Sequence, residues 1–134
     1  MNQLTKQRGF SLLSGVIVLI VVIFFLTCAV RIVPLYINNI TVKGALNSLA
    51  KEPSLTTMRK REIHRKLNKY FDVNNVNSEM SEAISIDNES GTTLININYE
   101  ERVPLAFNID AIITFENQLD VNNPDQCCSP RQSE

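Results

Sequence analysis

The sequence predicts an α+β protein in which an N-terminal transmembrane helix carries a small two-layer domain of two helices and a three-stranded antiparallel meander. Three observations lead to this fold class. Residues 10–30 form a run without charge or proline, residues 32–71 repeat apolar side chains at helical spacing, and residues 83–116 alternate as strands do. A chain of 134 residues with one such run divides into an anchor and one small domain.

Residues 10–31 are expected to cross a membrane once, after a short cytoplasmic leader at residues 1–9. At about 1.5 Å of rise per residue, residues 10–30 make a helix about 31 Å long, which matches the hydrocarbon core of a bilayer. A cleaved secretory signal fits less well, because the run is too long and no A-x-A site closes it. Lipid attachment at Cys28 is disfavoured by the bulky residues before it, which leaves this cysteine as a small apolar side chain of the helix.

The orientation of the anchor follows from basic residues near its start. Lys6 and Arg8 precede the run closely, whereas Arg31 and Lys43 follow it. Because basic loops stay in the cytoplasm, we expect a cytoplasmic N-terminus and a domain on the opposite side of the membrane.

The junction Arg8-Gly9-Phe10-Ser11-Leu12 resembles the processing site of type IV pilins and pseudopilins. In that family a short basic leader ends in glycine, cleavage falls before a phenylalanine, and the apolar helix continues into the exported domain. Gly9 and Phe10 are therefore a candidate leader-processing site. The chain departs from the family at Ser14, where the glutamate that filament assembly needs would stand. We expect an uncleaved anchor, with a pilin-like subunit as the alternative.

Residues 32–121 are expected to form the extracytoplasmic domain, which begins with the continuation of the membrane helix. The apolar positions that predict one buried face for this continuation are Leu35, Ile40, Val42, Leu46 and Leu49. Pro34 is expected to kink the helix, because its ring removes one backbone hydrogen bond. The Glu52-Pro53 pair is expected to end it, since the residue before proline avoids the α region.

Residues 54–71 predict a second helix, with Thr56 or Thr57 as its N-cap. Ile63, Leu67, Tyr70 and Phe71 make one apolar stripe on it. The basic cluster on the rest of the helix comprises Arg59, Lys60, Arg61, Arg65, Lys66 and Lys69. It is a candidate lipid-facing surface for anionic headgroups, and a solvated helix face is the alternative.

Three stretches predict the antiparallel meander with one apolar face: residues 83–87, 94–103 and 109–116. Turn residues at 88–91 and a bend at 104–108 separate them. The two helices are the available cover for the apolar face, which gives the two layers. Residues 122–134 are polar and are expected to form a flexible tail.

The segment Tyr99-Glu-Glu-Arg-Val-Pro-Leu-Ala-Phe-Asn-Ile-Asp110, with Arg8-Gly9 before the span and Val33-Pro34-Leu35-Tyr36 after it, resembles the domain-of-unknown-function 4845 family. This family contains short single-pass bacterial membrane proteins. The most specific part of the motif comprises Tyr99, Arg102, Val103, Pro104 and Leu105. The family has no assigned activity, so the resemblance implies an inner-membrane protein and no catalysis. Its members are often encoded beside the enzyme that removes secretory signal peptides.

Charge divides the chain into two complementary halves. Residues 1–69 hold 11 Lys and Arg against two carboxylates, and residues 70–134 hold two Arg against 12 carboxylates. The basic half and the acidic half can attract each other, or each can attract a partner of opposite charge. Nucleic acid fits poorly, because the basic cluster lacks interleaved aromatic residues and is expected outside the cytoplasm.

Enzymatic chemistry has few candidates, and we expect neither an enzyme nor a cofactor. His64 is the single histidine and lies among basic residues. Glu100 and Glu101 are adjacent on a predicted strand, so their carboxylates point to opposite faces. The sequence contains no glycine-rich phosphate loop, nucleophile elbow or CxxC motif.

Cys127-Cys128 has three open interpretations: a disulfide between the neighbours, a link between two chains, or reduced thiols. We favour the last two, since a loose tail offers nothing to hold the strained ring. The function expected from the whole sequence is a structural or accessory role beside the bilayer. We expect a protein partner in the inner membrane or the periplasm and no small-molecule substrate.

Overall fold

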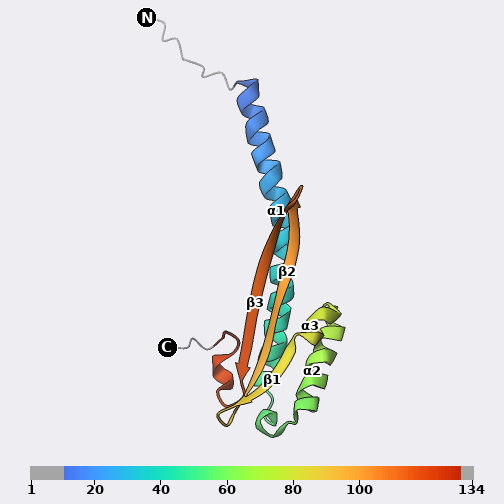
Figure 1. Ribbon diagram of the computed structural model, residues 1–134, viewed down its shortest axis with the longest axis vertical. Coiled ribbons are helices and arrows are strands. Elements are labelled where there is room, and N and C mark those ends of the chain that lie inside the picture. Colours follow the sequence, from blue (N-terminus) through green and yellow to red (C-terminus); the bar gives the residue numbers. More distant parts are fainter. Residues whose placement is uncertain (1–10, 131–134) are drawn as a thin grey trace, which may run out of the picture.

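The computed structural model describes residues 11–130 and has the predicted α+β architecture (Figure 1). The elements in chain order are α1 (Leu12–Ala50), η1 (Leu55–Thr57), α2 (Lys60–Val73), α3 (Ser78–Glu82), β1 (Ile84–Glu89), β2 (Thr92–Ala106), β3 (Ile109–Asp120) and η2 (Pro124–Gln126). The N-terminal half of α1 projects beyond the domain, and its C-terminal half lies along the sheet (Figure 1). α1 is long and apolar enough to cross a membrane, and its most apolar stretch is not buried by the rest of the described chain.

The apolar run and the first helix of the domain are one helix. α1 continues through Pro34, where the missing backbone N–H removes a single helical hydrogen bond. Pro34 therefore does not divide α1 into two helices. The helix ends at Ala50, shortly before Pro53 as the sequence predicts, and the Lys51 N–H donates to the Asn47 carbonyl at 3.3 Å.

The second helix begins later than the sequence predicts. Thr56 and Thr57, the expected N-caps, lie in the short 3-10 turn η1, which buries the side chain of Leu55. α2 instead starts after Arg59, whose backbone N–H donates to Oε2 of Glu62 at 3.2 Å. This bond provides an acceptor for a donor group at the helix start, as in a capping box.

A short helix without a periodic sequence pattern, α3, follows α2. Its N-cap is Asn77, whose side-chain oxygen accepts from the Glu79 N–H at 3.4 Å. α3 buries Met80 against the core. It leads directly into the first strand.

The sheet is an antiparallel meander with strand order β1-β2-β3. β1 pairs with the first half of β2, where Ile84 lies opposite Ile97. β3 pairs along nearly all of β2, with Tyr99 opposite Phe115. The β2–β3 ladder is longer than predicted and extends past β1 as a two-stranded hairpin toward the projecting half of α1 (Figure 1).

The core lies between the sheet and the two longer helices. Fully buried side chains come from every layer: Val42 and Leu46 on α1, Ile63, Leu67 and Phe71 on α2, Ile95 and Ile97 on β2, and Leu119 on β3. Three residues of the stripe predicted on α2 are therefore buried, and the fourth, Tyr70, is half-buried beside Gly44 of α1. Apolar burial of this kind is the main force that holds α1 and α2 on the sheet.

The first part of the expected tail is folded onto the domain. η2 follows β3, and the Gln118 N–H donates to the Cys128 carbonyl at 3.4 Å. Cys127 and Cys128 pack against the core and are joined by a disulfide. The expectation of reduced or intermolecular cysteines is wrong, because the hydrogen bond from β3 holds this segment against the core, where the Cys128 sulfur packs 3.5 Å from the Lys43 carbonyl oxygen.

Candidate interaction site on the helix and the hairpin

A polar junction fastens the hairpin to the middle of α1. Asn117 on β3 is fully buried, and its side-chain amide donates to Oδ1 of Asn39 at 2.8 Å and to the Ile97 carbonyl at 3.3 Å. The Tyr99 hydroxyl donates to the same Asn39 oxygen at 3.3 Å. One side chain of α1 thus receives donors from two neighbouring strands. Because an unpaired buried amide costs free energy, these bonds fix the position of α1 against the hairpin.

Aromatic rings pack beside this junction. Tyr36 meets Phe115 edge to face with 5.5 Å between ring centroids, and Tyr99 lies 5.2 Å from the same ring. Burial, together with the negative charge of Glu101, raises the pKa of Tyr99 to about 12. The phenol therefore remains protonated near neutral pH and acts as a hydrogen-bond donor to α1 rather than as a general base.

The motif residues Tyr99, Arg102, Val103, Pro104 and Leu105 all lie on β2. Val103 is buried, Leu105 is half-buried, and both share the α1-facing side of the strand with Tyr99. Arg102 points outward and lies 3.8 Å from the Asp110 carboxylate of β3. The Pro104 carbonyl accepts a hydrogen bond from the Arg31 guanidinium. The motif thus attaches the hairpin to α1 at a second level.

An apolar row runs along the side of α1 that the domain leaves uncovered. Its members Val33, Ile37 and Ile40 are 52%, 56% and 66% exposed. They are four and three residues apart, so they lie on one side of the helix. Further along α1, Tyr70 covers Gly44, where an added Cβ would lie 3.0 Å from the Tyr70 hydroxyl oxygen. The row ends where α2 begins to cover α1.

The apolar row corrects one part of the predicted helix face. Val42, Leu46 and Leu49 are buried as expected, but Ile40 is exposed. Residues two apart on a helix point about 200° away from each other, so Ile40 and Val42 cannot share a face. The spacing of the apolar row itself was the sequence signal that this prediction overlooked.

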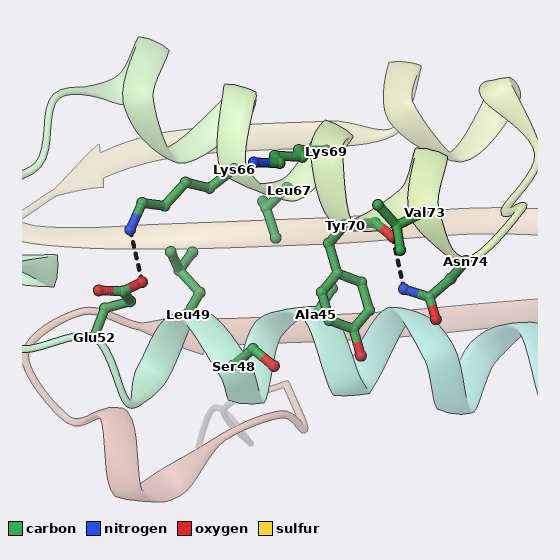
Figure 2. A pocket seen from close by; sticks show the side chains of 10 residues that line it. All are labelled: Ala45, Ser48, Leu49, Glu52, Lys66, Leu67, Lys69, Tyr70, Val73 and Asn74. Atoms are coloured by element: carbon green, nitrogen blue, oxygen red, sulfur yellow. Dashed lines mark hydrogen bonds and ion pairs between the residues drawn. The ribbon is translucent and has the colours of Figure 1, made fainter.

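The basic cluster lies on α2, beside the C-terminal end of α1 (Figure 2). α2 packs against α1 near Ala45 and Leu49, which at about 1.5 Å per residue are about 20–27 Å past Arg31. Charge interactions in physiological salt decay over about 8 Å. This placement disfavours contact with headgroups when α1 stands along the bilayer normal. The lipid-facing role of the cluster stays a prediction.

Members of the basic cluster differ in their contacts. Lys66 forms an ion pair with Glu52 at 2.6 Å, and the Lys60 ammonium donates to the Ile86 carbonyl at 2.9 Å. Arg59, Arg61, Arg65 and Lys69 are exposed. Within residues 11–130, no ion pair joins the cluster to an acidic side chain of the sheet.

A groove of about 400 Å³ lies between α1 and α2 (Figure 2). Ala45, Leu49 and Leu67 give it an apolar floor, and the Glu52–Lys66 ion pair crosses its edge (Figure 2). Glu52 is the one carboxylate among the lining residues, and Lys66 neutralises it.

His64 lies on α2, whereas Glu100 and Glu101 lie on β2. Nδ1 of His64 lies 3.1 Å from the side-chain nitrogen of Asn68 on the same helix. Glu100 is exposed on the outer side of β2, whereas Glu101 is half-buried on the side of Tyr99. Residues 11–130 contain no group of three or more His, Cys, Asp or Glu placed to hold a metal ion.

The candidate leader-processing site, Gly9 and Phe10, lies outside the described residues. Ser14, the departure from the pilin pattern, lies in the first turn of α1. Its hydroxyl carries no charge with which to pair a neighbouring amino terminus.

These contacts define an α+β domain carried on a long apolar helix and fastened to it by the hairpin. Residues 31–115 match the domain-of-unknown-function family DUF4845, and the chain belongs to this family. The matched segment includes the apolar row, Asn39 and the whole of the β2 motif. Neither a curated protein nor a solved structure matches the chain.

Proposed function

We propose that this protein is a single-pass accessory protein of the bacterial inner membrane, which presents its domain to the periplasm and binds an integral membrane protein through α1. The first part of α1 is the anchor in this proposal. The basic residues Lys6 and Arg8 before the apolar run support a cytoplasmic N-terminus.

The apolar row carries the proposal of a protein partner. A helix outside the bilayer normally shows a polar side to water, yet Val33, Ile37 and Ile40 are more than half exposed. The row spans about 10 Å along the helix and continues the apolar surface of the membrane segment. Contiguous exposed apolar surface of this kind marks an interaction site. A helix that leaves the bilayer beside α1 would cover it along its whole length.

A second candidate function is a pilin-like subunit matured at Gly9. The continuity of α1 favours it, because the helix runs from Leu12 into the domain without a break, as the pilin resemblance implies. In this alternative, the apolar row would pack against other copies of the chain. Ser14 argues against it, since the assembly glutamate is missing.

Site-specific photocrosslinking in the native membrane tests the proposal. A photoreactive residue at Ile37 is compared with the same residue at Val73, an exposed apolar position on α2. We expect an adduct with one integral membrane protein from Ile37 and not from Val73. Ile37→Lys should abolish copurification of that protein and leave the circular dichroism of the domain unchanged, because the side chain is exposed.

Other outcomes separate the two candidates. An adduct between two copies, together with a mature N-terminus at Phe10 by mass spectrometry, supports the pilin-like subunit. Identical adducts from Ile37 and Val73, or none from Ile37, contradict both uses of the apolar row.

A further inference from the structure

The turn between β2 and β3 presents a fully exposed aromatic side chain. Phe107 connects the strands, has a positive φ of 49°, and is not covered by any part of the described chain. Bulky residues rarely adopt this backbone conformation, and small polar residues are usual in such turns. An exposed phenylalanine in this strained conformation is therefore expected to be buried against a partner outside its own domain.

The level of the turn along α1 follows from two contacts. The Tyr99 hydroxyl meets Asn39, and five residues later the Pro104 carbonyl meets Arg31. The hairpin therefore advances toward the N-terminal half of α1, as Figure 1 also shows. At about 3.3 Å per strand residue, Phe107 reaches at most about 10 Å past Arg31. Arg31 is the first charged residue after the apolar run, so the turn lies beside the end of that run.

The chemistry of the hairpin changes at the same level. The hairpin tip, defined as residues 105–109, carries Leu105, Ala106, Phe107 and Ile109, with Asn108 as its one polar side chain. Ile109 is 61% exposed. Directly behind the tip, Arg102 pairs with Asp110, and Arg31 contacts Pro104. Charged groups thus begin where the span ends, and the tip beyond them is apolar.

We propose that the hairpin tip is a second membrane contact, with Phe107 inserted at the boundary between headgroups and acyl chains beside α1. This proposal rests on the anchor role of α1 proposed above. Apolar and aromatic side chains of peripheral segments insert about 5–10 Å into that boundary, which agrees with the reach of the tip past Arg31. Two attachment points fix the domain against the bilayer, so that the apolar row faces a constant direction.

Tryptophan fluorescence tests the proposal, because the chain contains no tryptophan. Three full-length variants are reconstituted separately in phosphatidylethanolamine–phosphatidylglycerol vesicles, with and without lipids brominated in the acyl chains. Phe107→Trp probes the tip, Leu19→Trp probes the anchor, and Val73→Trp reports an exposed site on α2. We expect blue-shifted emission from Phe107→Trp and brominated-lipid quenching at least about twofold above that of Val73→Trp. Ile109→Trp provides a second probe of the tip if Phe107→Trp does not fold.

The possible failures are distinct. If Leu19→Trp is quenched but the tip probe matches Val73→Trp in emission and quenching, the tip proposal is overturned and the anchor stands. A blue-shifted tip probe that brominated lipid does not quench also overturns it, because the tip then contacts protein. If Leu19→Trp escapes quenching, the anchor fails and the tip proposal fails with it.

Discussion

The side-chain amide of Asn117 on β3 donates to Oδ1 of Asn39 on α1 across 2.8 Å, although 78 residues separate them in the chain. Asn117 is fully buried at this contact. The bond, with the parallel one from Tyr99, ties the C-terminal strand to the helix that emerges from the apolar run. Two neighbouring strands of the hairpin therefore share one acceptor oxygen on α1.

Removing that acceptor should weaken the domain. Asn39→Ala leaves the Asn117 amide and the Tyr99 hydroxyl without their partner, and we expect the free energy of unfolding to fall by about 1–3 kcal/mol. Urea unfolding of the full chain in detergent, followed by the near-ultraviolet circular dichroism of tyrosine, measures it. The control is Asn47→Ala, an exposed position on α1 that should change the value by less than about 0.5 kcal/mol. Equal losses in both variants would contradict the assigned role.

Alkaline pH should destabilise the fold through Tyr99. The pKa of about 12 in the folded chain exceeds the ordinary value of 10.0, so the folded state binds the phenolic proton more tightly than the unfolded state. This contribution to stability is complete below pH 10 and is lost as the pH rises toward 12. This loss is checked by measuring the free energy of unfolding across this pH range for the native chain and for Tyr99→Phe. We expect the alkaline loss to be smaller in Tyr99→Phe, which also gives up about 1 kcal/mol at neutral pH; identical pH profiles would refute the assignment.

Gly44 should be coupled energetically to Tyr70. Alanine is favoured over glycine within a helix by about 1 kcal/mol, but a Cβ at this position lies 3.0 Å from the Tyr70 hydroxyl oxygen. In Tyr70→Phe the nearest ring atom lies at an ordinary contact distance of 3.9 Å. We therefore expect Gly44→Ala to raise the unfolding free energy by up to about 1 kcal/mol in the Tyr70→Phe background and by clearly less in the native background. A double-mutant cycle measures this difference. Additive effects of the two substitutions would show that the contact does not change the free energy of unfolding.

The fold class followed from patterns that act locally. The uncharged run up to Val30 and the alternation around Ile95 and Ile97 were sufficient to predict one long helix and an antiparallel meander. The start of α2 was mispredicted because Leu55 is buried, and its burial folds the threonines into a 3-10 turn. α3 escaped notice because a helix of five residues has too few turns to show a periodic pattern.

The candidate site was less predictable, since it is made of pairs that are distant in sequence. Nothing local marks Asn39 as the acceptor for Tyr99, or Arg31 as the partner of the Pro104 carbonyl. The motif resemblance selected the correct strand without giving the contacts. The disulfide was misjudged for the same reason, because the hydrogen bond from Gln118 that holds Cys128 arises only when the chain folds back on β3.

Truncating side chains on the two sides of α1 should have very different effects on stability. Leu46 is fully buried between the helices and the sheet, whereas Ile40 is 66% exposed in the apolar row. Leu46→Ala should lower the free energy of unfolding by about 2–5 kcal/mol, because it removes buried methyl groups and leaves a cavity. Ile40→Ala should change it by less than about 0.5 kcal/mol, since no core contact is lost.

The same pair separates stability from partner binding. If the apolar row is a docking surface, Ile40→Ala reduces the crosslinking yield from Ile37 while the domain stays folded. Urea unfolding and crosslinking of the same preparations provide both readouts. A large stability loss in Ile40→Ala would instead mean that the row belongs to the core of the domain, which would leave the proposed partner without its surface.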